Sequence, residues 1–549
     1  MNFQLIGTTS TGGIGVAAYK NLAFTGLGGN VNGVAILDIS NPANPVLVGQ
    51  TPPIAANMEE IRALRIGTRD VLVVSEQTGS MNPQGGLRMY DIGDPAHPVE
   101  IGFFPAFGGA YHFEIARQGK RTLALLGAIR TEEVTSNFGQ EPGTGDLIIG
   151  DISDPTNPLM VGEWGVLDEP ALGMSAYLSE RYGVMTNLYA EGVSASPDGR
   201  YAYLTYYDLG VVILDISNPA APRYLGRAGY QDGEEGNAFE AQTARGGTIL
   251  LRANLVRQAF QTQLSSNALT RDRTAGEDQN TPAIFALPGN RLVGDVVPVG
   301  RGCPGDPYLA DPAGKLALIQ FTAPREPGDC SYAEKVYRAQ QAGAIGAVLY
   351  NPTPTGGFND HHGPSGTPGR IVLPGNITEP LTIPSIAVGR DTGLCLEQVP
   401  DGEGGLLATD CTLAAPVTLT ATSNFSGYGG IDIFDIRNPA QPIKLSTFNT
   451  PNGMDVNVAL TRRYPNTTAP PSANHMVVVG NTVYAGWWGD GFRAIDISDP
   501  AHPREIGAWT GEGASPGDSR LQAWEPVIHN GMILLNSVRY GLYILNVVR

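Results

Sequence analysis

The chain has 549 residues, enough for several domains or for one large repetitive unit. Its formal net charge of −18 disfavours binding to nucleic-acid phosphates and to anionic membranes, and no apolar run approaches the roughly 18 residues that span a bilayer. The 71 glycines and 42 prolines argue against long helices and favour short strands joined by tight turns.

One motif recurs along the chain. Its first copy reads Gly33-Val-Ala-Ile-Leu-Asp38-Ile-Ser-Asn-Pro42, an apolar strand followed by an Asx-Pro turn that the aspartate organises. Six further copies are centred on Asp91, Asp151, Asp215, Asp435, Asp496 and, in degenerate form, Asn546. A strand follows each turn, and another pair of strands precedes each copy. Four strands per repeat and seven repeats predict a mainly β protein, a seven-bladed β-propeller.

The two ends of the chain are expected to close this ring. The last repeat stops after its third strand, near Val548, and Phe3-Gln-Leu-Ile-Gly7 resembles a fourth strand such as Arg504-Glu-Ile-Gly507. We therefore expect the N-terminal strand to complete the C-terminal blade, which removes two exposed sheet edges.

The repeats resemble the LVIVD-repeat family of bacterial surface and secreted propellers. All seven blades match, although the seventh has lost Asp and Pro. The resemblance implies a propeller fold and an extracellular, periplasmic or cell-surface location, but no defined activity. The first seven residues have neither the basic region nor the apolar core of a signal sequence, which indicates a cytosolic protein or one whose signal has been removed.

A gap of 220 residues between Asp215 and Asp435 interrupts the fifth repeat. Residues 314–319 are typical of a buried strand, Ser331-x-x-Glu334 of a capping box that opens a helix, and residues 344–350 of the next strand. We expect an α/β domain over residues 285–416, inserted into blade five between propeller segments 1–261 and 424–549. Polar, unpatterned linkers are expected at residues 262–281 and 416–423.

This insert resembles the protease-associated (PA) domain. The matching elements are Gly314-Lys315 before a strand, Cys330-Ser331 before a helix, Gln341-Ala-Gly-Ala344 leading into a strand, and Ile383-Pro384. PA domains are usually non-catalytic parts of secreted or vacuolar hydrolases and sorting receptors. The resemblance therefore implies control of ligand or substrate access, and not chemistry.

All four cysteines lie in the insert, and an even number in one small domain favours disulfides. The sequence leaves three pairings open, and we favour Cys303–Cys330 and Cys395–Cys411 because each pair is nearest along the chain. A zinc site is the alternative, but no C-x-x-C spacing occurs. Disulfides imply an oxidising compartment.

The order of strands predicts which face of the propeller carries function. In a four-stranded meander, the connection between the second and third strands opens on the same face as the connection between blades. The insert and the long inter-blade connections therefore share one face, which we call the top, whereas the Asx-Pro turns of the bottom face are short. Long loops on a rigid scaffold are the usual place for binding.

The first residues of the innermost strands should lie near the top mouth of the central channel. They include two histidines and several glutamates: Glu59, Glu60, His112, Glu114, Glu191, Glu240, His475 and Glu525. Of these, His112, Glu191, Glu240, His475 and Glu525 could hold a divalent cation, with Ca, Zn and Fe left open, and a bound metal could activate water. The alternative is a solvated channel whose polar side chains satisfy one another.

Two other groups qualify as candidates. Trp487, Trp488 and Trp524 fall near the top of blades six and seven, where they could stack on a sugar or an aromatic ring or simply pack the blades. Asp360-His361-His362 lies in a Gly/Pro-rich loop of the insert.

Two functions are consistent with these patterns. The first is a secreted or cell-surface binding protein whose top-face channel mouth, covered by the PA-like domain, takes a small-molecule, peptide or glycan ligand. The second is a metal-dependent hydrolase or lyase that uses the His/Glu residues at the mouth. No nucleic-acid partner and no membrane span are expected.

Overall fold

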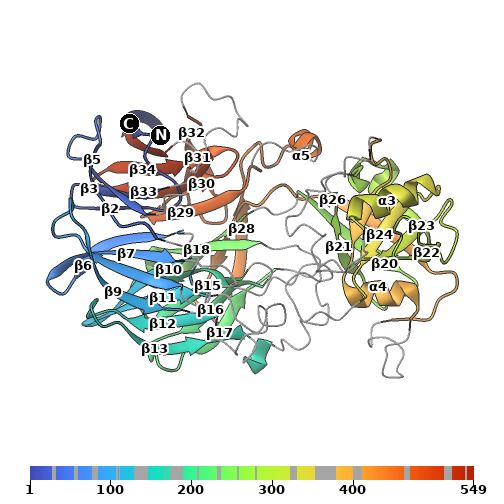
Figure 1. Ribbon diagram of the computed structural model, residues 1–549, viewed down its shortest axis with the longest axis horizontal. Coiled ribbons are helices and arrows are strands. Elements are labelled where there is room, and N and C mark those ends of the chain that lie inside the picture. Colours follow the sequence, from blue (N-terminus) through green and yellow to red (C-terminus); the bar gives the residue numbers. More distant parts are fainter. Residues whose placement is uncertain are drawn as a thin grey trace.

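The computed structural model describes residues 1–27, 33–54, 58, 60–76, 85–106, 109–110, 112–128, 146–166, 169–172, 190–206, 209–230, 237–255, 259–278, 281–321, 330–352, 377, 379–399, 411–462, 470–511, 522–537 and 541–548. Seven four-stranded antiparallel sheets and one closed barrel make up the strands (Figure 1). The predicted seven-bladed propeller with an inserted α/β domain is confirmed.

The first four blades follow one another along the chain. From the channel outward, blade one contains β2 (Val16–Tyr19), β3 (Leu22–Gly26), β4 (Val34–Asp38) and β5 (Val46–Gln50), and blade two contains β6 (Ile61–Ile66), β7 (Arg69–Glu76), β8 (Gly86–Asp91) and β9 (Val99–Pro105). In the same order, blade three contains β10 (Phe113–Gln118), β11 (Arg121–Gly127), β12 (Leu147–Asp151) and β13 (Leu159–Trp164), and blade four contains β14 (Ala190–Ala195), β15 (Tyr201–Tyr206), β16 (Gly210–Asp215) and β17 (Arg223–Ala228).

The last three blades contain the insertion and the closure. Blade five contains β18 (Ala238–Ala244), β19 (Ile249–Asn254), β27 (Ile431–Asp435) and β28 (Ile443–Phe448). Blade six contains β29 (Ala473–Val479), β30 (Thr482–Trp487), β31 (Gly491–Asp496) and β32 (Arg504–Trp509), and blade seven contains β33 (Ala523–His529), β34 (Met532–Ser537), β35 (Gly541–Val548) and β1 (Asn2–Thr9).

The repeated motif has the structural role that its pattern indicates. In the first copy, the Asp38 carboxylate accepts the backbone N–H of Ser40 at 2.8 Å, and this bond to the residue two positions on recurs at the five other aspartates. The apolar residues of the strands pack between blades: Phe24 of blade one and Leu72 of blade two share one buried cluster. Burial of these alternating side chains holds adjacent blades together.

The ends of the chain close the ring as predicted. Strand β1 pairs antiparallel with β35, from Asn2 opposite Val548 to Thr9 opposite Leu542. The N- and C-terminal ends accordingly lie side by side in Figure 1. The last blade therefore has no unpaired edge at its third strand.

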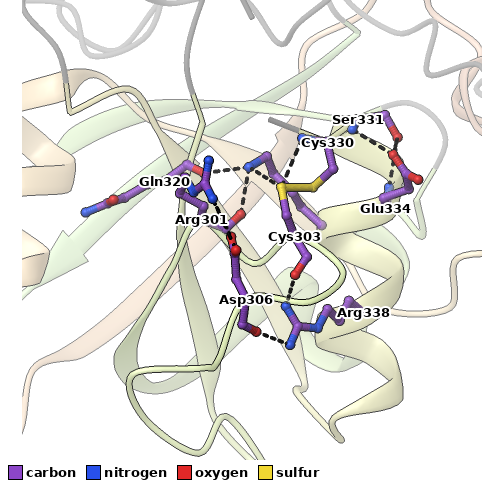
Figure 2. Close-up of a disulfide and its surroundings, with 9 residues drawn as sticks. Arg301, Cys303, Asp306, Gln320, Cys330, Ser331, Glu334 and Arg338 are labelled. Atoms are coloured by element: carbon purple, nitrogen blue, oxygen red, sulfur yellow. Dashed lines mark hydrogen bonds and ion pairs between the residues drawn. A yellow bond between two sulfur atoms is a disulfide. The ribbon is translucent and has the colours of Figure 1, made fainter. Parts of the chain in front are cut away.

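The insert is a closed barrel with helices packed on it. Its strands are β20 (Phe260–Ser266), β21 (Arg273–Glu277), β22 (Arg291–Gly300), β23 (Leu316–Gln320), β24 (Gly346–Tyr350), β25 (Ser385–Ala387) and β26 (Thr418–Phe425), and its helices are α3 (Tyr332–Gln341) and α4 (Arg390–Glu397). The capping box of α3 forms as predicted between Ser331 and Glu334. Both predicted disulfides, Cys303–Cys330 and Cys395–Cys411, are confirmed, and Figure 2 shows the first of them.

The insert enters blade five where the sequence predicts, because β19 and β27 are neighbours in one sheet. The expectation of unstructured linkers is wrong. Strands β20 and β26 belong to the barrel and pair with each other from Phe260 opposite Phe425 to Ser266 opposite Leu419. The sequence did not indicate these strands because they contain many polar residues. Along each strand, buried positions alternate with more exposed ones.

An apolar cluster reinforces the base of this ribbon. Phe260 lies 5.2 Å from Phe285 and 5.6 Å from Phe425, measured between ring centroids. These rings pack with Ala459 and Leu460 of α5 (Val456–Arg462), a helix in the connection between blades five and six. In Figure 1, α5 lies on the side of the propeller from which the inserted barrel projects. The insert is thus joined to the propeller by a packed β-ribbon.

Within the residues that the structure describes, no helix has the length and apolar character needed to cross a membrane.

Candidate functional site at the channel mouth

The innermost strands bring the predicted polar residues together at the mouth of the channel. Equivalent positions at or next to the start of these strands hold Glu60, His112, Glu191, Glu240, His475 and Glu525. Glu59 lies outside the described residues, as does Asp360-His361-His362 of the insert.

Three of the glutamates each join one blade to the next by a hydrogen bond. The carboxylate of Glu60 accepts the backbone N–H of Phe113 at 2.8 Å, that of Glu240 accepts Met476 at 2.8 Å, and that of Glu525 accepts Val16 at 3.1 Å. Each bond joins one blade to the inner strand of the following blade. These carboxylates therefore have a structural role that the sequence interpretation did not assign to them.

An arginine that the sequence analysis missed lies among these carboxylates. Arg62 forms ion pairs with Glu60 and with Glu525, the latter with 3.3 Å between Nη1 and Oε1. It follows Glu60 by two residues, so strand alternation places both on the same face, a signal that was present in the sequence. Glu114 interacts electrostatically with Arg62, and its carboxylate accepts the backbone N–H of its neighbour Ile115 at 2.7 Å.

The contacts of the glutamates bear on the predicted metal-ligand set. Among the described residues, no group of three or more His, Cys, Asp or Glu side chains is arranged to hold a metal ion. Both oxygens of Glu240 accept protein hydrogen bonds, from Gln242 and Met476, and both oxygens of Glu525 contact protein groups. The guanidinium of Arg62 adds a positive charge beside them. Glu240 and Glu525, two of the five predicted ligands, are therefore engaged with protein groups.

The two histidines are neutral, and one nitrogen of each is held by the protein. His112 Nδ1 lies 2.9 Å from the carbonyl oxygen of Glu191, and His475 Nδ1 lies 3.1 Å from Oε2 of Glu240. A carbonyl oxygen only accepts, so Nδ1 of His112 carries the proton; a carboxylate oxygen that also accepts the Met476 N–H favours the same tautomer at His475. Each Nε2 is then a hydrogen-bond acceptor.

Burial explains why the imidazoles stay uncharged. It lowers the pKa of His112 to about 3, with a further lowering from His475, and it lowers the pKa of His475 to about 4 although Glu60 opposes the shift. Both rings therefore remain neutral throughout the physiological pH range.

Aromatic rings surround the two imidazoles. The His112 and His475 rings lie 4.9 Å apart in an edge-to-face arrangement, and Phe239 lies 5.2 Å and 5.1 Å from them. Trp524 lies 5.4 Å from His475, and Trp488 lies 6.1 Å from Trp524. We call these five residues the mouth cluster. Trp487 is not part of it, because its indole N–H donates to Pro471 inside blade six.

Irregular strand pairing builds this cluster. The inner strands of blades four to seven each have a register shift near their first residues, for example between Ala238 and Glu240 and between Ala523 and Pro526. A β-bulge breaks the alternation of side chains and re-aims one of them. Phe239 and Glu240 therefore both contribute to the mouth, as do Trp524 and Glu525, whereas strict alternation would turn one of each pair away.

Four ring nitrogens of the mouth cluster are buried without a partner. Within the described part of the chain, no hydrogen-bond partner is present for Nε2 of His112 and His475 or for Nε1 of Trp488 and Trp524. A buried polar atom in this state costs roughly 1–3 kcal/mol, and proteins rarely leave one unexplained. Four in one cluster mark this place as different from the rest of the propeller core.

The shared guanidinium predicts a pH effect on stability. Burial raises the pKa of Glu525 to about 8, against the opposing effect of Arg62, because one guanidinium faces two buried carboxylates. Between the ordinary pKa of 4.5 and about 8, the folded protein holds a proton that the unfolded chain has lost. This contribution to stability is complete below pH 4.5 and is lost as the pH rises through 8. We expect the free energy of unfolding to fall by about 2 kcal/mol between pH 6.5 and 9.

Urea unfolding at several pH values measures this effect. Glu525→Gln should remove the larger part of the slope, since it keeps an oxygen for the Val16 N–H but does not titrate; Glu240, whose pKa burial raises to about 7, accounts for the remainder. The lowered pKa values of the two histidines act only below about pH 6.5, outside the tested window. If the free energy of unfolding of the variant fell with pH as steeply as that of the unmodified chain, the assignment of the effect to Glu525 would be wrong.

The fold and site define a seven-bladed propeller with an inserted α/β barrel and an aromatic–histidine cluster at the channel mouth. Comparison with known families agrees with the resemblances in the sequence. The LVIVD repeat matches residues 15–51, 143–165, 189–228 and 471–510, and the PA domain matches residues 291–396. The chain therefore contains LVIVD repeats, in a seven-bladed propeller, and a PA domain.

The relatives found are aminopeptidases that share only part of the chain. Leucine aminopeptidase 2 of Trichophyton equinum is 27% identical over 207 residues, which cover 35% of this chain and 41% of that protein. Leucine aminopeptidase 2 of Arthroderma otae is 30% identical over 118 residues, covering 20% and 23%. The chain thus spans less than half the length of the curated relatives it matches.

Similar solved structures include the β-propeller domain of Myceliophteria thermophila Cps50 (Swd1), with a TM-score of 0.42 at 11% identity and complete coverage of both chains. A zinc aminopeptidase from Bacillus subtilis matches with a TM-score of 0.20 at 18% identity, covering 34% of this chain and 36% of its own. Neither superposition is close enough to carry an argument about function.

Proposed function

We propose that this protein is a secreted or cell-surface binding protein that takes a small-molecule, peptide or glycan ligand at the top-face channel mouth. The observation that carries the proposal is the set of four buried, unpartnered ring nitrogens in the mouth cluster. A ligand that satisfied them would form hydrogen bonds that no described protein group makes. The two disulfides support an oxidising, extracytoplasmic setting.

The PA domain acts in this proposal as a cover that limits access to the mouth. Its attachment between β19 and β27 supports this role, because that connection opens on the same face as the connections between blades. The packed base of the ribbon β20–β26 favours a cover held in one place over a swinging one. A metal-dependent hydrolase is less favoured, since two of its expected ligands, Glu240 and Glu525, are engaged with protein groups.

Binding and cover are tested together by excising the barrel. Thr262 and Ser423 are register partners at the base of the ribbon, so replacing residues 263–422 with Asn-Gly converts β20 and β26 into a hairpin. Phe260 and Phe425 remain to cover α5. We expect the excised chain to keep a cooperative β-rich melt.

Sugars, amino acids and short peptides are then screened by thermal shift at millimolar concentration with both chains. We expect at least one class to raise the melting temperature of the intact chain and to associate faster with the excised chain. No shift in either chain would overturn the binding function. Equal association rates would overturn the role of the PA domain as a cover and leave binding intact.

A further inference from the structure

The unpartnered atoms of the mouth cluster are of two kinds. His112 and His475 each present a lone pair at Nε2, because their Nδ1 atoms are held by Glu191 and Glu240. Trp488 and Trp524 each present an indole N–H, which only donates. A ligand that satisfied all four atoms would donate two hydrogen bonds and accept two within a single network of contacting rings.

The geometry points to a neutral saccharide as the ligand, with one sugar ring placed against the mouth cluster; this inference rests on the binding function proposed above. A hydroxyl group both donates and accepts, so adjacent sugar hydroxyls can satisfy an imidazole lone pair and an indole N–H at the same time. Successive ring contacts in the cluster span 4.9 to 6.1 Å, which keeps donors and acceptors close together.

The charges around the cluster argue for a ligand without net charge. The two imidazoles are uncharged, as described above, and the indoles never ionise. The Glu240 carboxylate, which contacts His475, is already bonded to Gln242 and Met476 as well. A buried ammonium or carboxylate on the ligand would lose its hydration without gaining a counter-charge, a cost that a hydroxyl avoids.

The aromatic rings of the cluster are suited to contact the C–H groups of a sugar ring. Phe239 and Trp524 lie edge-to-face, 5.9 Å apart, next to the imidazoles. The face of an aromatic ring carries partial negative charge, and the C–H bonds on one side of a sugar ring carry partial positive charge. The same five residues thus supply an apolar face and hydrogen-bonding atoms.

Trp488 marks the side from which the ligand approaches. Its side chain is half-buried, whereas His112, Phe239, His475 and Trp524 are each at most 8% exposed. Access therefore runs past Trp488 toward Trp524 and the histidines. We include the barrel-excised chain in the test for this reason.

The experiment titrates neutral methyl pyranosides and disaccharides, in parallel with zwitterionic amino acids and dipeptides, into the intact and excised chains by calorimetry. His112→Phe keeps a ring but loses the Nε2 acceptor, and Trp524→Phe keeps a ring but loses the N–H donor. Each is expected to weaken binding of a saccharide roughly tenfold, since a hydroxyl then loses its partner. His97→Gln, in an exposed bottom turn, serves as the matched control and should bind as the unmodified chain does.

The outcomes separate the ligand class from the binding function. Saccharide binding that both variants weaken, with cooperative melts preserved, supports the inference. Zwitterion binding weakened by the same variants would overturn the saccharide and leave the binding function standing. Saccharide binding that neither variant changes would place the sugar elsewhere and overturn the site. No binding by any probe, in either the intact or the excised chain, would overturn both proposals.

Discussion

Replacing Asp432 with alanine is expected to lower the free energy of unfolding of the propeller by about 3–5 kcal/mol. Asp432 is fully buried on β27 and lies 2.6 Å from the equally buried guanidinium of Arg252 on β19. Burial alone would raise the pKa of Asp432, but Arg252 and Lys444 outweigh it and hold that pKa well below its usual range. Removing the carboxylate would take away the ion pair that the buried Arg252 charge forms across blade five.

This ion pair matters because it joins the two halves of blade five across the insertion. Arg252 and Asp432 are direct register partners, although 180 residues separate them in the chain. Arg252 also donates to the carbonyls of Ala228 and Gly229 and lies over the ring of Tyr230, so it connects blade four as well. The loss should therefore affect more than one blade.

Urea unfolding followed by circular dichroism measures the change. The matched control is Glu100→Ala. It removes a carboxylate that lies 2.9 Å from Arg88, in an ion pair where the Glu100 side chain is 43% exposed. An exposed pair of this kind contributes at most about 1 kcal/mol. The double variant Arg252→Met/Asp432→Leu should cost less than Asp432→Ala, because the fully buried guanidinium is removed together with the carboxylate. Equal losses for Asp432→Ala and Glu100→Ala would contradict the buried-pair assignment.

The second large effect is expected in the inserted domain when Cys303 and Cys330 are both replaced by serine. The disulfide closes a loop with a sequence separation of 27, and such a constraint on the unfolded chain contributes about 3 kcal/mol. It also lies against buried Lys335, whose ammonium group donates to the carbonyls of Arg301 and Gln320. Arg338 bonds the carbonyl of Cys303, so α3 and the disulfide support each other.

Native-state hydrogen exchange in the full chain measures this effect locally. Protection of the α3 amides should fall by about the stated amount, while the amides of the propeller strands keep theirs. Replacing Cys395 and Cys411 instead should reduce protection around α4, where Cys395 lies, more than in α3. Loss of protection throughout the propeller in either variant would show that the barrel and the blades unfold as one unit.

Much of the fold could be predicted because it depends on local, repeated patterns. An apolar strand followed by an Asx-Pro turn specifies the outer half of a blade wherever it occurs, and seven copies require seven blades. The closure by β1 followed from the missing fourth strand of the last repeat. The pairing Cys303–Cys330 followed from proximity in the chain, which favours closing the shorter loop.

The positions of the candidate residues along the chain could be predicted, but the contacts they make could not. His112, Glu240, His475 and Glu525 do lie at the start of the inner strands. Their residue types indicated metal ligands, yet the backbone N–H groups of neighbouring blades occupy the carboxylates. Which donor a carboxylate meets depends on how adjacent blades are set against each other, and no local pattern records that.

Tertiary structure alone decided the mouth cluster and the attachment of the insert. The register shifts beside Glu240 and Glu525 depend on how each inner strand fits its partner strand, and they turn Phe239 and Trp524 toward the histidines. The ribbon of β20 and β26 joins segments more than 150 residues apart, so its pairing is invisible to any local period. Strand and turn patterns act over a few residues and are legible in the sequence, whereas bulges, inter-blade bonds and long-range pairing exist only when distant segments pack together.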